Sequence, residues 1–147
     1  MSIDETVQKV LAEEARLDPR IPNIYKSFQN NVTHIKDNLL SELNREKNKG
    51  KKIAAYGAAA KGVTLLNYCE ITTNLIDFVV DRNPNKSGKF IPGVKIPIYN
   101  EEFLKLNLPD LLLVLPWNLA NEIKNQISPY LKPDHKILRA IPRVEYI

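Results

Sequence analysis

The sequence is short of the residues that build metal sites and disulfides. Cys69 is the only cysteine, and the two histidines, His34 and His135, lie far apart in the chain. A single cysteine excludes an internal disulfide and a zinc site built from cysteines. Neither histidine has a nucleophile or a paired carboxylate beside it in a motif, so we expect no catalytic residue and no metal site. We interpret Cys69, which lies in an apolar helical run, as a core residue.

Long apolar runs are also missing. No window approaches the ~20 apolar residues that a membrane span requires, and the acidic start of the chain lacks the apolar core of a signal peptide. We therefore expect a cytoplasmic protein with no membrane partner. The net charge of +4 makes nucleic acid a possible partner class. However, the densest basic stretch, residues 45–52, has no aromatic residue to stack on a base and contains Glu46, so we expect no nucleic-acid binding.

What remains is the composition of one ordinary globular domain. The chain has 147 residues, 44% of them hydrophobic and 26% charged, which leaves no room for a second complete catalytic domain. Apolar residues recur at helical spacing over residues 3–16 and 24–47. We predict an N-terminal helical segment, residues 1–49, that packs on a domain formed by residues 50–147. Oligomerisation is the alternative role for the apolar stripe of the second helix: Phe28, Val32, Ile35, Leu39 and Leu43.

From Gly50 onward, short apolar runs alternate with helical segments. Four runs have the composition of buried strands: residues 52–56, 75–80, 111–115 and 137–141. Two stretches between them are typical of helices: residues 60–69 and 119–131. The alternation predicts an α/β fold, with a Rossmann-like, mostly parallel sheet and flanking helices. Residues 82–99 are rich in proline and glycine, so we expect an ordered loop there, which can include a short hairpin.

The most informative stretch follows the first expected strand. It is a variant of the dinucleotide-binding fingerprint, with alanine in place of the middle glycine: Gly57, Ala58, Ala59, Ala60, Lys61 and Gly62. Small residues let backbone amides approach a ligand, and the first turn of the next helix offers unpaired donors to an anion. We therefore predict a phosphate site, with Lys61 beside it. The alternatives are that the small residues serve only helix-on-strand packing and that Lys61 faces solvent.

Two further strand ends carry candidate binding residues. Asp81 follows the second expected strand, at the distance from the glycine motif where dinucleotide folds place an acid that accepts from a ribose hydroxyl. Alternatively, Asp81 pairs with Arg82 or caps the loop. Pro116, Trp117 and Asn118 follow the third expected strand. The indole can stack on a base or a sugar and the amide can donate to it, whereas a helix N-cap is the alternative role of Asn118.

Four blocks of sequence extend these motifs: residues 56–69 (YGAAAKGVTLLNYC), 80–88 (VDRNPNKSG), 92–98 (PGVKIPI) and 115–119 (LPWNL). In this order they resemble the carboxyl-terminal domain of sugar C-methyltransferases. Members of that family use S-adenosylmethionine to methylate a ring carbon of a dTDP-linked keto-deoxysugar. In them, a zinc-binding domain and a central S-adenosylmethionine domain precede a Rossmann-like domain of this kind.

The resemblance implies a dTDP-sugar as ligand and an S-adenosylmethionine-binding methyltransferase domain, in cis or in trans, as partner. We expect this domain to bind no cofactor and to be inactive alone, because no cysteine cluster and no separate methyltransferase fingerprint precede the matched blocks. An NAD(P)-binding oxidoreductase or sensor domain is the alternative function. The residues expected to contact the nucleotide sugar are Gly57, Ala58, Ala59, Ala60, Lys61, Gly62, Asp81, Arg82, Asn83, Lys86, Pro116, Trp117 and Asn118.

Overall fold

The computed structural model describes residues 5–16 and 22–147, which divide into two compact units with a boundary between His34 and Ile35. The first unit contains α1 (Glu5–Arg16) and the beginning of α2 (Pro22–Asn48). Residues 3 and 4 of the first predicted helix lie outside the described residues. Several large apolar side chains of this unit are exposed to solvent: Val7, Val10, Leu11, Tyr25 and Phe28.

The second unit is built on one six-stranded sheet with the order β3-β2-β1-β4-β5-β6. Its strands are β1 (Ile53–Tyr56), β2 (Phe78–Val80), β3 (Ile98–Tyr99), β4 (Leu111–Val114), β5 (Lys136–Arg139) and β6 (Glu145–Tyr146). The first five are parallel, and β6 runs antiparallel to β5. This mostly parallel α/β sheet confirms the predicted fold class. The strand order reverses between β1 and β4, and such a switch point is where open α/β sheets bind ligands.

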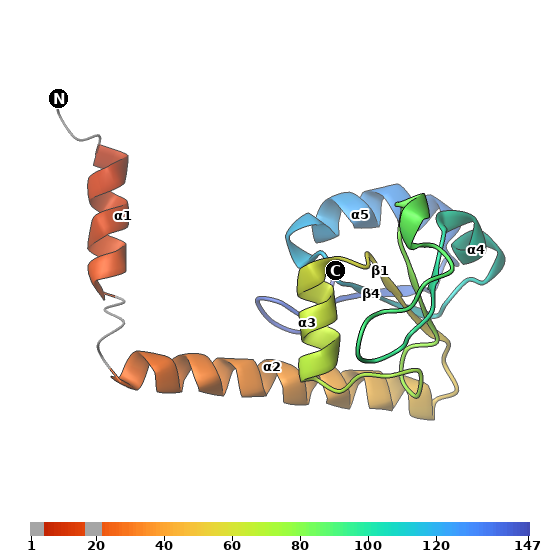
Figure 1. The fold of residues 1–147 in the computed structure, drawn as a ribbon, viewed down its shortest axis with the longest axis horizontal. Coiled ribbons are helices and arrows are strands. Elements are labelled where there is room, and N and C mark those ends of the chain that lie inside the picture. Colours follow the sequence, from red (N-terminus) through yellow and green to blue (C-terminus); the bar gives the residue numbers. More distant parts are fainter. Residues whose placement is uncertain (1–4, 17–21) are drawn as a thin grey trace. The chain divides into compact units, whose positions relative to one another are not determined.

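Helices cover both faces of the sheet, because alternate strand residues point to opposite faces. Ala55 and Leu113 face a core cluster with Leu66 of α3 (Ala60–Tyr68) and with the part of α2 in this unit, where Leu39 and Leu43 are fully buried. Tyr56 and Val114 face a second cluster with α4 (Glu101–Leu106) and α5 (Ala120–Ile127). In Figure 1, α4 and α5 lie on one side of β1 and β4, and the part of α2 from Ile35 onward lies on the other.

The short elements depart from the sequence prediction. The strand expected over residues 75–80 is only Phe78–Val80, and β3, α4 and β6 were not predicted. The segment 82–99 contains the short turn η1 (Pro84–Lys86) and an antiparallel bridge between Phe90 and Pro97, but it ends in β3, which pairs with β2. The helix expected over residues 119–131 consists of α5 between two 3-10 turns, η2 (Trp117–Leu119) and η3 (Ser128–Tyr130).

Cys69 is 1% exposed, which confirms that it is a core residue. Among the described residues, no helix is both long and apolar enough to cross a membrane. In the same part of the chain, no three His, Cys, Asp or Glu side chains gather in an arrangement that can hold a metal ion. Open α/β sheets bind ligands at the loops that follow the carboxyl ends of their parallel strands.

Candidate functional site

Two glycines of the fingerprint allow close packing at the end of the sheet. Gly57 has φ +91°, and a Cβ there would lie 2.4 Å from Cγ of Pro116. A Cβ on Gly62 would lie 2.7 Å from Cβ of Leu115. Gly57 thus lets the connection after β4 close against the glycine loop, and Gly62 lets α3 approach the end of β4. Close packing accounts for both glycines without a ligand.

The amides at the start of α3 are not accounted for by packing. Ala59 occupies the N-cap position without a side-chain bond, and its own amide donates to the Gly57 carbonyl at 2.8 Å. Within the described part of the chain, no acceptor takes the amide protons of Ala60, Lys61 or Gly62. These donors stand at the positive end of the helix dipole. The loop therefore has unused capacity for an anion.

Lys61, Trp117 and Asn118 meet on the side of the sheet covered by α3. The Lys61 ammonium lies 4.8 Å from the centre of the Trp117 ring and donates to Oδ1 of Asn118. The alternative role of Asn118 as an N-cap is wrong, because it lies within η2 and α5 begins later, with no side-chain cap. Lys61 is partly buried and its hydrogen bond to Asn118 is exposed to solvent, so the ammonium is both paired and solvent-facing.

Asp81 ties the glycine loop to the loop after β2. Asp81 as a whole residue is 8% exposed. Its Oδ2 accepts from the Ala58 amide at 2.7 Å and from the Lys86 ammonium at 2.9 Å, and its Oδ1 accepts from the Asn83 amide at 2.8 Å. The Lys86 ammonium also donates to the Ala58 carbonyl at 2.9 Å. The loop-capping alternative for Asp81 is therefore confirmed.

The predicted alternative of an Asp81–Arg82 pair is wrong. The Arg82 guanidinium instead lies near Glu101 of α4, with 3.7 Å between Nε and Oε1. The same Oε1 accepts a hydrogen bond from the Tyr56 hydroxyl. Burial, together with this bond to Glu101, raises the pKa of Tyr56 above its ordinary value near 10, so the phenol keeps its proton and acts as a donor.

An open cavity of about 190 Å³ lies where β1, β2 and β4 end, at the switch point of the sheet. Its lining includes four residues predicted from the sequence, Gly57, Asp81, Arg82 and Pro116. The remaining lining residues come from the end of β1 and from the region of α5: Tyr56, Leu119, Glu122, Ile123 and Gln126. The cavity thus opens on the side covered by α4 and α5.

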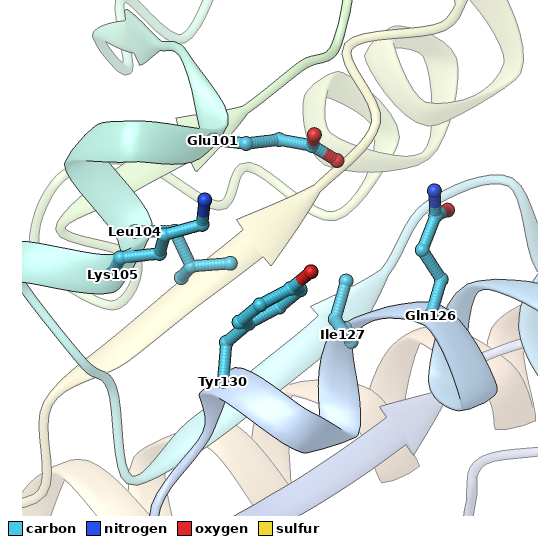
Figure 2. Close-up of a pocket in the computed structure, with 6 residues that line it drawn as sticks. All are labelled: Glu101, Leu104, Lys105, Gln126, Ile127 and Tyr130. Atoms are coloured by element: carbon cyan, nitrogen blue, oxygen red, sulfur yellow. The ribbon is translucent and has the colours of Figure 1, made fainter.

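A second cavity, of about 70 Å³, lies between α4 and α5 (Figure 2). It is lined by Glu101, Leu104, Lys105, Gln126, Ile127 and Tyr130. Gln126 lines both cavities, and the hydrogen bond from Tyr56 to Glu101 joins the lining of one to the lining of the other. The two cavities therefore adjoin, and together we call them the α4–α5 groove.

The residues predicted to bind thus fall into three arrangements. Lys61, Trp117 and Asn118 meet beside α3, while Asp81 and Lys86 hold the loops together. Asn83 donates its amide to Asp81, and the others line the α4–α5 groove or lie between the end of β1 and the first turn of α3. The sequence patterns did not indicate Tyr56, Glu101 or Gln126 as site residues. A usable signal preceded Glu101, because Asn100 caps α4 by accepting from the amide of Phe103 at 3.0 Å.

Comparison with known proteins places the chain in a family. The sequence matches the C-methyltransferase C-terminal domain family over residues 1–142. C-methyltransferase NovU from Streptomyces niveus is 30% identical over 141 residues, which cover 96% of this chain and 34% of that protein. The chain therefore spans about a third of the length of this curated relative.

Among solved structures, UDP-D-quinovosamine 4-dehydrogenase from Vibrio fischeri superposes with a TM-score of 0.49 at 16% identity, over 66% of this chain and 93% of that one. A likeness at this level carries no functional argument. The family match, in contrast, extends over nearly all of the sequence. On that match and on the relative at 30% identity, this chain belongs to the C-methyltransferase C-terminal domain family.

Proposed function

We propose that this chain is the nucleotide-sugar-binding domain of an S-adenosylmethionine-dependent sugar C-methyltransferase. The observation that carries the proposal is the set of free amides at the start of α3, in a loop whose Gly57 lines the open cavity at the switch point of the sheet. Methyl transfer itself is assigned to an S-adenosylmethionine-binding domain in cis or in trans. In this division of labour, the domain supplies affinity and orientation for a dTDP-sugar.

The diphosphate of the ligand belongs at the start of α3. The amides of Ala60, Lys61 and Gly62 point at no protein acceptor among the described residues, and the helix dipole favours an anion there. The Lys61 ammonium now donates to the neutral amide oxygen of Asn118, an exposed residue. A phosphate oxygen is the stronger acceptor for an ammonium, so the ligand replaces Asn118 at small cost. Trp117, beside Lys61, offers an aromatic face to the base.

The contacts of Asp81 favour this proposal over an NAD(P)-binding domain. Recognition of the ribose in dinucleotide folds uses a carboxylate at this position as an acceptor. Here that carboxylate already accepts from two backbone amides and one ammonium. A carboxylate has about four acceptor positions, so these three donors leave at most one of them for a ribose hydroxyl.

Isothermal titration calorimetry with dTDP tests the proposal. We expect the wild-type chain to bind dTDP and not S-adenosylmethionine. Lys61→Ala should weaken dTDP binding about ten- to a hundredfold, because it removes one charge-assisted hydrogen bond. Lys89→Ala is the matched control, since Lys89 is exposed and has no side-chain partner among the described residues. Absence of dTDP binding up to millimolar concentration would contradict the proposal.

A further inference from the structure

The α4–α5 groove contains polar groups whose hydrogen-bonding capacity is unused. Both contacts to Glu101, from Tyr56 and from Arg82, are made to Oε1, which leaves Oε2 without a partner in the described part of the chain. The side-chain amide of Gln126 lines both cavities, and none of the described residues bonds to it. Figure 2 shows the carboxylate of Glu101 and the amide of Gln126 extending into the space between α4 and α5.

Apart from Lys105, the rest of the lining of the smaller cavity is apolar or aromatic. Leu104 and Ile127 are 2% exposed and form its wall, and the ring of Tyr130 stands beside them (Figure 2). An apolar wall with a few convergent polar groups is the usual composition of a small-molecule site. A pyranose ring matches it, because the ring has apolar C–H edges and hydroxyls that donate to a carboxylate and both donate to and accept from an amide.

The charges of the groove favour hydroxyls over phosphates. Three carboxylates line the two cavities, those of Asp81, Glu101 and Glu122, against two cations, Arg82 and Lys105. Each cation already lies beside a glutamate, at 3.7 Å for Arg82 and 2.8 Å for Lys105. The groove therefore has no surplus positive charge to offer a diphosphate. A neutral group that donates hydrogen bonds suits it better.

We propose, on the basis of the function proposed above, that the hexose of the nucleoside-diphosphate hexose lies in the α4–α5 groove. Oε2 of Glu101 accepts from its hydroxyls, and the amide of Gln126 bonds a neighbouring hydroxyl. Gly57 and Pro116 line the groove, and Gly57 closely precedes the free amides of α3. A ligand whose diphosphate occupies those amides can therefore extend its sugar over Gly57 into the groove. Glu101 and Gln126 thereby become the residues that determine sugar affinity.

The experiment compares dTDP with dTDP-glucose on the full chain by isothermal titration calorimetry. The quantity measured is the ratio of the two affinities, which isolates the contribution of the hexose. We expect Gln126→Ala to lower this ratio about three- to tenfold and Glu101→Gln to lower it about tenfold, with dTDP affinity unchanged.

Each variant has a matched control on its own helix. Asn125→Ala removes an exposed amide next to Gln126 on α5. Glu102→Gln removes a carboxylate from the first turn of α4, which also contains Glu101. The Glu102 side chain pairs with Lys105 and is 73% exposed. Both controls should leave the ratio at the wild-type value. Circular dichroism melting curves verify that every variant is folded.

The outcomes separate this inference from the function on which it rests. If the wild type binds dTDP but the ratio is unchanged in both Gln126→Ala and Glu101→Gln, the sugar lies elsewhere and the function proposal stands. A wild type that binds neither ligand overturns both. If Glu101→Gln does not fold, Gln126→Ala decides alone, because none of the described residues hydrogen-bonds to the Gln126 side chain.

Discussion

Asp81 holds the loop after β1 against the loop after β2, and replacing it tests this role. Its carboxylate is the common acceptor for the amides of Ala58 and Asn83 and for the ammonium of Lys86. Asp81→Asn keeps the size of the side chain but leaves one acceptor oxygen and places an NH2 group where a second acceptor stood. We therefore expect a loss of stability with no change in the packing of the sheet.

The magnitude follows from the burial of the three donors. A hydrogen bond to a charged group contributes about 1.5–3 kcal/mol, and an unpaired buried donor costs about 1–3 kcal/mol. The Ala58 amide is buried, whereas Asn83 and Lys86 have access to water that can replace part of their bonds. We therefore expect Asp81→Asn to lower the free energy of unfolding by about 3 kcal/mol. For a chain of this size, the melting temperature should fall by roughly 6–12 °C.

Urea denaturation at pH 7, followed by circular dichroism, measures this change. The m-value should stay constant while the midpoint falls. Glu70→Gln is the control, because Glu70 pairs with Lys36 at 3.3 Å through a side chain that is 85% exposed, and such a pair contributes at most about 1 kcal/mol. A loss below about 1 kcal/mol for Asp81→Asn would refute the role of Asp81 as the tie between the loops.

Three further predictions concern packing, acid stability and ligand detection. Gly62→Ala should lower the free energy of unfolding by about 1–2 kcal/mol in urea titrations, because the clash with Leu115 outweighs the helix-propensity gain of about 1 kcal/mol; an unchanged midpoint would count against it. The hydrogen bond from the Lys49 ammonium is the main cause that lowers the pKa of Glu46 to about 2, from its ordinary 4.5. The stability that this buried carboxylate contributes, at most about 3 kcal/mol, is present above about pH 4.5 and is lost as the pH falls toward 2, so melting curves of Glu46→Gln should be less acid-sensitive over that range. Trp117 is the only tryptophan, so dTDP that stacks near it should change the intrinsic fluorescence, and unchanged emission at saturation would remove Trp117 from the site.

The sequence was sufficient to predict the long-range framework of the fold. The apolar runs at β1 and β4, the turn at Gly57 and the position of Asp81 all follow from local patterns that a parallel sheet requires. The missed elements are short: β3 has two residues and α4 has six. Elements of this length depend on tertiary contacts, which here are the pairing of β3 with β2 and the burial of Leu104.

The candidate site was predictable only in part, for a related reason. Local motifs located the residues that follow β1, β2 and β4, because strand ends are visible in the sequence. They did not reveal that Tyr56 and Glu101, 45 positions apart, share a hydrogen bond, or that Gln126 faces the same space. They suggested Asp81 as the partner of Arg82 and did not indicate Glu101, because that pairing depends on where α4 packs.

A thermal-shift comparison tests whether this domain binds a nucleotide sugar. The chain is heated in parallel with dTDP, UDP, NAD and S-adenosylmethionine, because a ligand that binds the native state raises the melting temperature. We expect the melting temperature to rise with dTDP and to stay unchanged with NAD or S-adenosylmethionine. A rise with NAD alone, or no rise with dTDP at millimolar concentration, would contradict this expectation.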